Sequence, residues 1–166
     1  NLTFSSNICY CVCKSMSNSN TAFIRYVFLD IIGYSKLTIE VQAFIVEALN
    51  KVVQAALKGN KVQKKGRVLI PVGDGIGIAL LNAARKYDSH IRLSLSILRH
   101  LEEYNQQADE KNKFQMRIGV HQNTDILITD INEMPNVAGT GINVTARIMG
   151  LADGNQILVS RGVYDE

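Results

Sequence analysis

The apolar residues of the chain follow two spacings, and the first of them predicts a buried strand. Residues 24–32 (IRYVFLDII) are apolar almost without interruption, with Arg25 and Asp30 as the exceptions. A continuous run of this length is typical of a strand that is buried on both faces. The turn residues 33–35 (GYS) follow it, and Thr38 is placed to cap the next element.

A helical spacing replaces the continuous run after this turn. Apolar side chains recur at three- and four-residue steps until Gly59 and Asn60, which predicts a long amphipathic helix. Its apolar positions are Val41, Phe44, Ile45, Ala48, Leu49, Val52 and Val53. Two extended segments then flank the glycine-rich residues 73–75 (GDG), namely 67–72 (RVLIPV) and 76–81 (IGIALL). This arrangement predicts a hairpin with a tight turn.

The second half of the chain begins with another predicted helix, at residues 88–105. We expect its apolar stripe to face the core; the stripe consists of Ile91, Leu95, Leu98 and Leu101. Alternating apolar residues then predict a strand with one buried face at residues 114–120. A further strand is expected at residues 125–131, joined to the previous one through residues 121–123 (HQN).

The last expected elements are a helix at residues 141–151 and a short strand at residues 156–160 (QILVS). Helices separated by antiparallel pairs indicate an α+β fold of the ferredoxin-like, or palm, kind, in which helices pack on an antiparallel-rich sheet. We expect a flexible leader at residues 1–22 and a single domain at residues 23–166. The chain stops as a further helix begins, so we expect the C-terminal end of the domain to be truncated.

Composition and charge exclude several functional classes. The 166 residues carry a net charge of +3, and the one basic cluster, at residues 61–67, is interpreted as a solvated loop, so no nucleic-acid partner is expected. No apolar run is long enough to span a membrane. The N-terminus also lacks the succession of basic, apolar and small residues that is typical of a secretory signal. Cys9, Cys11 and Cys13 are too close together for a disulfide framework, and the rest of the chain has no cysteine. We therefore expect a cytoplasmic protein.

Two aspartates are candidate metal ligands. Asp30 interrupts an apolar strand near its end, and Asp74 lies at the tip of the predicted hairpin. A carboxylate in so apolar a run is costly to bury without a partner. If the two strands are neighbours, the carboxylates face each other and present the hard oxygen ligands that Mg²⁺ or Mn²⁺ requires. The plainer interpretations are a strand-end cap for Asp30 and a turn residue for Asp74.

Two other groups of residues suit the binding of phosphate. The N–H groups of residues 32–35 can form a small anion cradle ahead of the first helix. Asn143 and Arg147 are four positions apart, so they share one face of the predicted helix. An arginine and an amide presented together can stabilise charge on a transferring phosphoryl group. The plainer interpretation is a polar helix face.

Five short motifs lie in order along the chain, from about Tyr26 to Glu166. They are FLDIIGYS at residues 28–35, VGDG at 72–75, MRIGVH at 116–121, GINVTARIM at 141–149 and GNQILVS at 154–160. Taken together they resemble the catalytic domain of the class III adenylate and guanylate cyclases. No single motif is as specific as the series, and the resemblance excludes the leader.

This resemblance implies a head-to-tail homodimer with two active sites, each shared between the subunits. It implies that Asp30, Ile31 and Asp74 hold two ions of Mg²⁺ or Mn²⁺, and that Asn143 and Arg147 are supplied by the partner chain. The substrate would be a nucleoside triphosphate whose 3′-hydroxyl attacks the α-phosphate in line. Arg147 would offset charge on that phosphate, and Asn143 would orient the ribose. Because these positions are intact, we expect an active enzyme.

The residues that would surround the base depart from the family pattern. Relatives that use purines usually carry Lys or Glu at the position of Ile70, and Asp, Thr or Cys at that of Asn136. An aliphatic side chain cannot hydrogen-bond a purine edge, whereas an amide both donates and accepts and could serve a pyrimidine. For Asn136 a loop cap is the plainer interpretation.

The resemblance also assigns phosphate binding to Gly33 and Tyr34, although an aromatic residue at position 34 could simply belong to the core. Thr124 stands where some relatives have a phosphate-binding arginine.

In these departures the chain is similar to the stand-alone pyrimidine cyclases of bacterial antiphage (Pycsar) systems, which make cyclic UMP or cyclic CMP. We therefore favour a pyrimidine cyclase over an adenylate cyclase with an unusual pocket. A catalytically silent nucleotide-binding or dimerisation module remains as a third hypothesis. A diguanylate cyclase lacks support because no GGDEF-like stretch is present. The regulator, the effector, and whether a further C-terminal segment carries a phosphate-binding lysine stay open.

Overall fold

The computed structural model describes residues 20–81 and 87–166. Its elements are β1 (Thr21–Ile31), η1 (Tyr34–Lys36), α1 (Ile39–Gly59), η2 (Lys64–Gly66), β2 (Arg67–Val72), β3 (Gly75–Leu81), α2 (Ser89–Gln107), η3 (Glu110–Asn112), β4 (Met116–Thr129), β5 (Pro135–Ala138), α3 (Thr140–Gly150), β6 (Ile157–Val159) and α4 (Arg161–Tyr164). The strand predicted at residues 24–32 starts three residues earlier than expected, at Thr21. Most of the predicted leader, with its three cysteines, lies outside the described residues.

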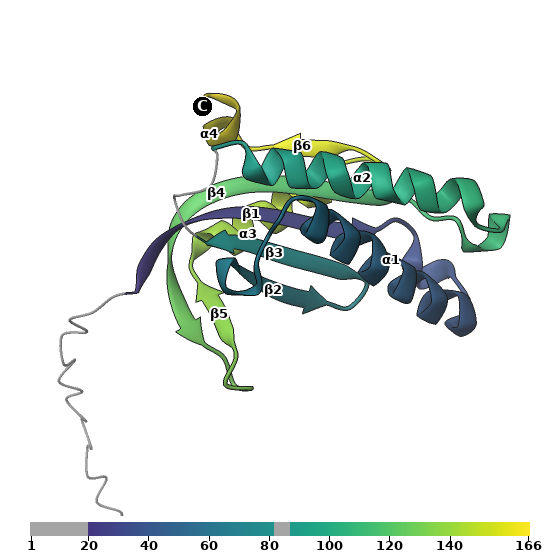
Figure 1. The fold of residues 1–166 in the computed structure, drawn as a ribbon, viewed down its shortest axis with the longest axis horizontal. Coiled ribbons are helices and arrows are strands. Elements are labelled where there is room, and N and C mark those ends of the chain that lie inside the picture. Colours follow the sequence, from purple (N-terminus) through teal and green to yellow (C-terminus); the bar gives the residue numbers. More distant parts are fainter. Residues whose placement is uncertain (1–19, 82–86) are drawn as a thin grey trace, which may run out of the picture.

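The strands form one mixed sheet in the order β2-β3-β1-β4-β5, and β6 pairs with β4 on the side away from β1 (Figure 1). All neighbours are antiparallel except β4 and β6, which are parallel. The central strand β1 therefore has partners on both sides. The antiparallel-rich sheet with helices packed on it confirms the predicted fold class.

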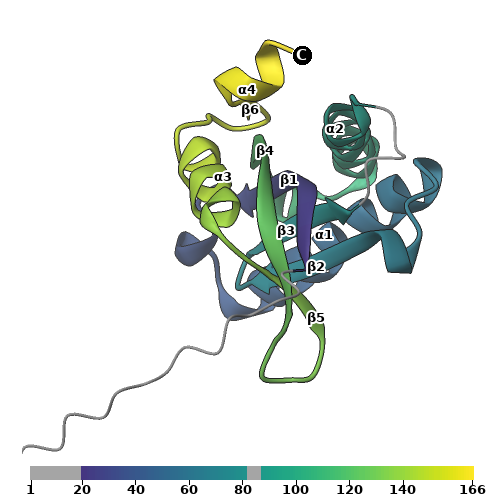
Figure 2. The ribbon, with the colours of Figure 1, turned by 90° about the vertical axis from the view of Figure 1, so that its left-hand side faces the viewer.

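Helices cover both faces of this sheet, which explains why β1 is apolar almost throughout. In Figure 2 the sheet is seen between α3 on one side and α1 with α2 on the other. Alternate residues of β1 serve the two layers: Val27, Leu29 and Ile31 join the α1–α2 core, and Ile24, Tyr26 and Phe28 join the α3 side. No helix within the described parts of the chain is both long and apolar enough to cross a membrane.

One predicted break in the sheet is wrong, because β4 runs continuously through residues 121–123. The polar sequence HQN suggested a connection, yet each of its residues faces a residue of β1, with Asn123 opposite Ile24. Backbone pairing with the long central strand keeps the segment extended whatever its polarity. Beyond Thr129, the predicted loop at Asn136 is also wrong, since this residue lies in strand β5.

Of the predicted stripe of α2, Ile91, Leu98 and Leu101 pack in or against the core as expected, but Leu95 does not. Leu95 is 58% exposed, whereas Leu93, Ile97 and Leu101 are fully buried. The difference arises because polar residues of α2, among them Ser94, are buried beside the leucines and hide the true stripe in the sequence. At the start of α1, Thr38 takes the predicted cap position, but its side chain makes no capping hydrogen bond to the helix.

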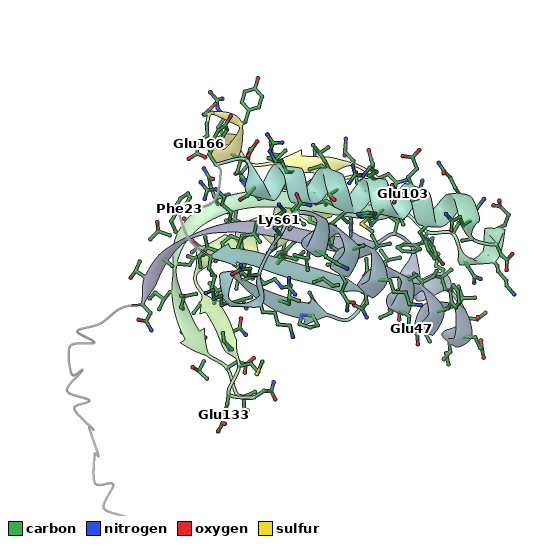
Figure 3. All side chains as sticks on the ribbon, viewed as in Figure 1. Phe23, Glu47, Lys61, Glu103, Glu133 and Glu166 are labelled. Carbon is green, nitrogen blue, oxygen red and sulfur yellow. The ribbon has the colours of Figure 1, made fainter. Side chains whose placement is uncertain are left out.

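The hairpin of β4 and β5 extends beyond the two helices α1 and α2 (Figure 1). Glu133 marks its tip in Figure 3 and has a positive φ of 60° within the turn. Ile131 is 97% exposed and Met134 is 60% exposed beside it. The hairpin thus presents apolar side chains to solvent away from both core clusters.

Candidate active site

The structure places Asp30 beside the turn that carries Asp74. Asp30 lies opposite Gly75 in the β1–β3 pair, and Asp74 immediately precedes that glycine. Opposite Cα atoms in antiparallel strands are about 4.5–5.5 Å apart. Gly73 has a φ of 60°, which suits the first central position of a two-residue hairpin turn. Two aspartates that are 44 positions apart in sequence therefore lie close together along the backbone, at the same end of the β1–β3 pair.

The two oxygens of Asp30 have different surroundings. Oδ2 accepts hydrogen bonds from Arg117 Nη2 at 2.7 Å and from Nε at 3.1 Å. Oδ1 faces Gly75, where an added Cβ would lie 3.3 Å from it and 2.6 Å from the main-chain oxygen of Leu29. Oδ1 accepts no hydrogen bond from the described residues, and the Asp30 side chain remains 18% exposed.

This arrangement fits a divalent cation bound together with a triphosphate. Mg²⁺ is usually held by one or two carboxylates, with phosphate oxygens and water completing the octahedron. Asp30 and Asp74 would supply the carboxylates, and the main-chain oxygen of Ile31, next to Asp30 on β1, would be a further hard donor. Within residues 20–81 and 87–166 there is no group of three or more His, Cys, Asp or Glu side chains suited to a metal. The residues therefore fit an ion that needs the substrate to complete its shell.

Only part of the predicted anion cradle is free to bind. The N–H of Ile32 donates to Gln115 O at 2.9 Å, which removes it from the cradle. The N–H groups of Gly33 and Tyr34 donate no main-chain hydrogen bond within the described residues. The Tyr34 ring packs against the α1–α2 core, as the plainer interpretation expected. Gly33 and Tyr34 could thus contribute main-chain N–H groups but not the aromatic ring.

Asn143 and Arg147 both lie on the exposed face of α3. The opposite face is buried at Gly141 and Thr145, and Thr145 Oγ1 donates to Gly141 O at 2.5 Å. No hydrogen bond or ion pair joins Asn143 or Arg147 to the aspartates in the described part of the chain. Within one chain, the two predicted groups, the aspartates and the α3 pair of Asn143 and Arg147, are therefore not in contact through a hydrogen bond or an ion pair.

Arg117 is a site residue that sequence reasoning missed. It lies opposite Asp30 in the β1–β4 pair, and its Nη1 also reaches Gly150 O, at the end of α3, over 3.4 Å. The signal was present in the motif MRIGVH, because the alternation of Met116 and Ile118 toward the core puts the arginine on the other face.

The residues expected to surround a base lie on two strands that approach each other, β2 and β5. Ile70 is partly buried and packs against the α3-side cluster. Asn136 lies opposite Ile128, and its Oδ1 accepts a hydrogen bond from the N–H of Val137 at 2.8 Å. Its amide nitrogen is therefore the group left to meet a ligand. Thr124 on β4 is exposed.

His121 closes the motif MRIGVH but serves the packing of β4. Its Nδ1 lies 2.8 Å from Ser160 Oγ, just after β6. Burial lowers the pKa of His121, and the nearby Asp125 opposes this shift. A neutral imidazole that joins two parallel strands accounts for the residue without a catalytic role.

Comparison with known proteins agrees with this geometry. The profile of the adenylate and guanylate cyclase catalytic domain matches residues 16–166. Comparison with curated protein sequences finds no match. Among solved structures, the guanylyl cyclase Cya2 has a TM-score of 0.74 at 19% identity, over 89% of this chain and 79% of that one. A bacterial light-regulated adenylyl cyclase has a TM-score of 0.69 at 19% identity, over 87% of this chain and 79% of that one.

A third similar structure is the guanylate cyclase domain of RhGC from Catenaria anguillulae, solved in complex with GTP. It has a TM-score of 0.66 at 16% identity, over 87% of this chain and 81% of that one. Likenesses at such low identity show the fold, whereas the profile match spans nearly the whole chain. The chain therefore belongs to the family of adenylate and guanylate cyclase catalytic domains.

Proposed function

We propose that the protein converts a pyrimidine nucleoside triphosphate, UTP or CTP, into a 3′,5′-cyclic nucleotide and pyrophosphate, at two sites shared by the chains of a homodimer. The observation that carries the proposal is the position of Asp30 beside the Asp74 turn, with one carboxylate oxygen left open. In the reaction a bond forms between the ribose 3′-oxygen and the α-phosphorus, and the bond from that phosphorus to the pyrophosphate breaks. The proton of the hydroxyl is released to solvent.

Each proposed residue has one task in this reaction. Asp30, Ile31 and Asp74 would hold two ions of Mg²⁺ or Mn²⁺. Bound divalent ions would favour ionisation of the 3′-hydroxyl and offset the charge of the triphosphate. Arg147 offsets charge that develops on the α-phosphate, because a guanidinium matches phosphate oxygens in shape and charge. Asn143 orients the ribose through its amide.

The exposed position of α3 supports a shared site. Asn143 and Arg147 point away from the core and form no contact with Asp30 in the described structure. A site that needs both groups is therefore incomplete in one chain, and a second copy can supply the missing half. Ile131 and Met134 on the β4–β5 hairpin offer exposed apolar surface for such an association.

The choice of base rests on two side chains and on the sequence resemblance. Ile70 offers no hydrogen bond to a purine, and Asn136 retains a free amide nitrogen that can donate to a pyrimidine carbonyl. The placement in antiphage signalling rests on the resemblance to the Pycsar cyclases alone.

A product assay tests this proposal directly. The protein is incubated with each of the four ribonucleoside triphosphates and Mn²⁺ or Mg²⁺, and the products are separated. Cyclic UMP or cyclic CMP as the only cyclic product supports the pyrimidine assignment. Cyclic AMP alone would make the protein an adenylate cyclase, and the absence of every cyclic nucleotide would leave a silent nucleotide-binding module.

A mixing experiment tests the shared site. Asp30→Ala and Arg147→Ala chains should each be inactive as homodimers, whereas their mixture should regain activity. At equal concentrations half of the dimers are mixed and each has one whole site out of two, so about one quarter of the wild-type rate is expected. Asp153→Asn, in an exposed turn, is the matched control and should keep full activity. A mixture as inactive as its parents would contradict the shared site.

A further inference from the structure

Asp125 on β4 is a buried carboxylate that the proposed chemistry does not use. The residue is only 4% exposed, and it lies opposite Ala22 in the β1–β4 pair. A carboxylate is strongly disfavoured in such surroundings unless its oxygens are hydrogen-bonded. None of the ion pairs formed by the described residues includes Asp125. Its charge is therefore met by hydrogen-bond donors alone.

Three donors saturate this carboxylate. The Tyr26 hydroxyl donates to Oδ2 at 2.7 Å, and the amide of Asn123 donates to Oδ1 at 2.8 Å. The third donor is the main-chain N–H of Gly141, 3.0 Å from Oδ2. Burial and, secondly, the hydrogen bond to Asp125 raise the pKa of Tyr26 well above its usual value, so the phenol keeps the proton that it donates.

The third donor belongs to the first turn of α3. Gly141 is the second residue of this helix, where main-chain N–H groups have no partner within the helix. The cap position holds Gly139, which has no side chain to accept such a bond. Asp125 therefore caps the helix from another element, at the end where the helix dipole favours negative charge. Asn123 adds a second link, from its amide to Thr140 Oγ1 at 3.0 Å.

Two glycines allow this close approach. A Cβ at Gly139 would lie 2.0 Å from Asp125 Oδ1, and a Cβ at Gly141 would lie 2.3 Å from Oδ2. The added atom at Gly141 would also lie 2.4 Å from Tyr26 Cε2. The chain thus wraps the carboxylate between two residues that lack side chains, and any other residue would push the start of α3 away from β4.

We propose that Asp125 is a positioning residue that fixes the start of α3, and through it Asn143 and Arg147, for catalysis in the site shared with the partner chain. This inference rests on the proposed function. Asn143 and Arg147 lie two and six residues after Gly141 on the same helix. A helix moves as a rigid rod, so a shift or rotation at its first turn carries both side chains with it. A displacement of about 1 Å in a positioning group can cost about 100-fold in rate.

Kinetics of Asp125→Asn test the inference first. The amide has the shape of the carboxylate but is uncharged and keeps only one accepting oxygen. Either Asn123 loses its acceptor, or Tyr26 and Gly141 lose theirs together. We expect kcat to fall about 30- to 100-fold, with KM for the triphosphate within about threefold, because α3 acts on the transition state. Asp153→Asn is the control and should match the wild-type protein. Wild-type kcat in Asp125→Asn would overturn the inference.

Mixing then separates a positioning role from a general loss of folding. Asp125→Asn chains mixed with Asp30→Ala chains should regain activity, because the site built from α3 of one variant and the aspartates of the other is whole. Asp125→Asn mixed with Arg147→Ala should not, because both variants are defective in α3. If Asp30→Ala with Arg147→Ala regains activity but Asp30→Ala with Asp125→Asn does not, the inference is wrong and the proposed function stands.

Amide hydrogen exchange gives a readout that needs no activity. In Asp125→Ala, which removes the acceptor of the Gly141 N–H altogether, this N–H should exchange at least about tenfold faster, while that of Val27 in the centre of β1 stays protected. If Asp125→Asn does not fold, Tyr26→Phe replaces it, with an expected fall in kcat of about three- to tenfold and the same mixing pattern. Failure of the wild-type protein to make any cyclic nucleotide would refute the proposed function, and unchanged exchange at Gly141 would refute the role of Asp125.

Discussion

Asp30 and Asp125 lie on the neighbouring strands β1 and β4, on the same α3-facing side of the sheet, yet their surroundings differ. The Asp30 side chain is 18% exposed, is paired with Arg117 through Oδ2, and has a second oxygen that accepts no hydrogen bond from the described residues. The Asp125 residue is 4% exposed, has no cationic partner among the described residues, and has both oxygens hydrogen-bonded. The strand pair therefore carries one available carboxylate and one saturated carboxylate.

The difference teaches how one residue type serves two tasks in a small domain. A metal ligand must keep an oxygen for the ion, and Asp30, the proposed ligand, has an oxygen that accepts no hydrogen bond from the described residues. A structural carboxylate is removed from water, so protein donors must replace the hydrogen bonds that water made. Both oxygens of such a carboxylate therefore accept hydrogen bonds from the protein. Substitutions at the two positions should therefore change different measurable properties.

The largest contrast between the two carboxylates is expected when each of Asp30 and Asp125 is replaced by asparagine. Bound metal ions supply several kcal/mol of catalysis, so Asp30→Asn should lower turnover by at least about 1000-fold, at 1.36 kcal/mol for each factor of ten. Its free energy of unfolding should change by less than about 1 kcal/mol, because the pair with Arg117 is partly exposed. Turnover assays, Mn²⁺ binding by electron paramagnetic resonance and urea unfolding measure these effects.

The matching variant Asp125→Asn should behave in the opposite way. It should keep Mn²⁺ binding and lose about 1–3 kcal/mol of stability, because a buried donor is left without its acceptor. An equal loss of Mn²⁺ binding in both variants would remove the distinction between the two carboxylates.

The glycines around Asp125 give the next effect in size. Gly141→Ala should destabilise the protein by about 1–3 kcal/mol or more, because its Cβ would enter both the carboxylate and the Tyr26 ring. Gly150→Ala, at the other end of α3, is the matched control, since an added Cβ there meets nothing within 4 Å. This control should leave stability unchanged or raise it by up to about 1 kcal/mol. Thermal and urea unfolding decide the matter, and equal effects at both glycines would contradict the close packing at Asp125.

The same comparison shows which features the sequence could predict. Asp30 was identified because it interrupts an apolar run, and an anomaly of that kind is local. Asp125 sits in the polar stretch HQNTD, where an aspartate is unremarkable, and its partner Tyr26 is 99 positions away. Arg117 was missed for the same reason, since only the register of β1 and β4 places it opposite Asp30.

The fold follows the same division between local and distant causes. The first strand, the hairpin and helices α1 and α3 were predicted because their spacing and turn residues are contained in each segment. The continuity of β4 through residues 121–123 was not, because pairing with β1 imposes it from outside. Strand β5 was missed because its four residues, the first of which is a proline, are too few to show a periodicity, and only pairing with β4 defines it.

At alkaline pH, the free energy of unfolding should fall because of Tyr26, whose hydroxyl donates to Asp125. The folded-state pKa of Tyr26 is raised above the unfolded value, so above about pH 10 the unfolded chain loses this proton while the folded chain keeps it. Stability from this group is thus complete below about pH 10 and falls above it, by up to about 1.36 kcal/mol per pH unit. Urea unfolding between pH 9 and about pH 11.5 should show this fall in the wild-type protein and a smaller one in Tyr26→Phe. Tyr164→Phe, at a residue that is 78% exposed, should behave as wild type, and parallel profiles for all three proteins would contradict the prediction.

The smallest expected effect lies in the pair of Arg117 with Asp30. A double-mutant cycle with Arg117→Gln and Asp30→Asn should give a coupling free energy below about 1 kcal/mol, because both side chains are partly exposed and water screens their attraction. The cycle of Tyr26→Phe with Asp125→Asn should give about 1–3 kcal/mol, because the buried hydroxyl finds no water to replace its acceptor. Urea unfolding of the wild-type protein, the four single variants and the two double variants measures both values. A larger coupling at Asp30 than at Asp125 would mean that the carboxylate assigned to the metal is held as firmly as a structural one. In that case the arginine would compete with the ion for the same oxygens.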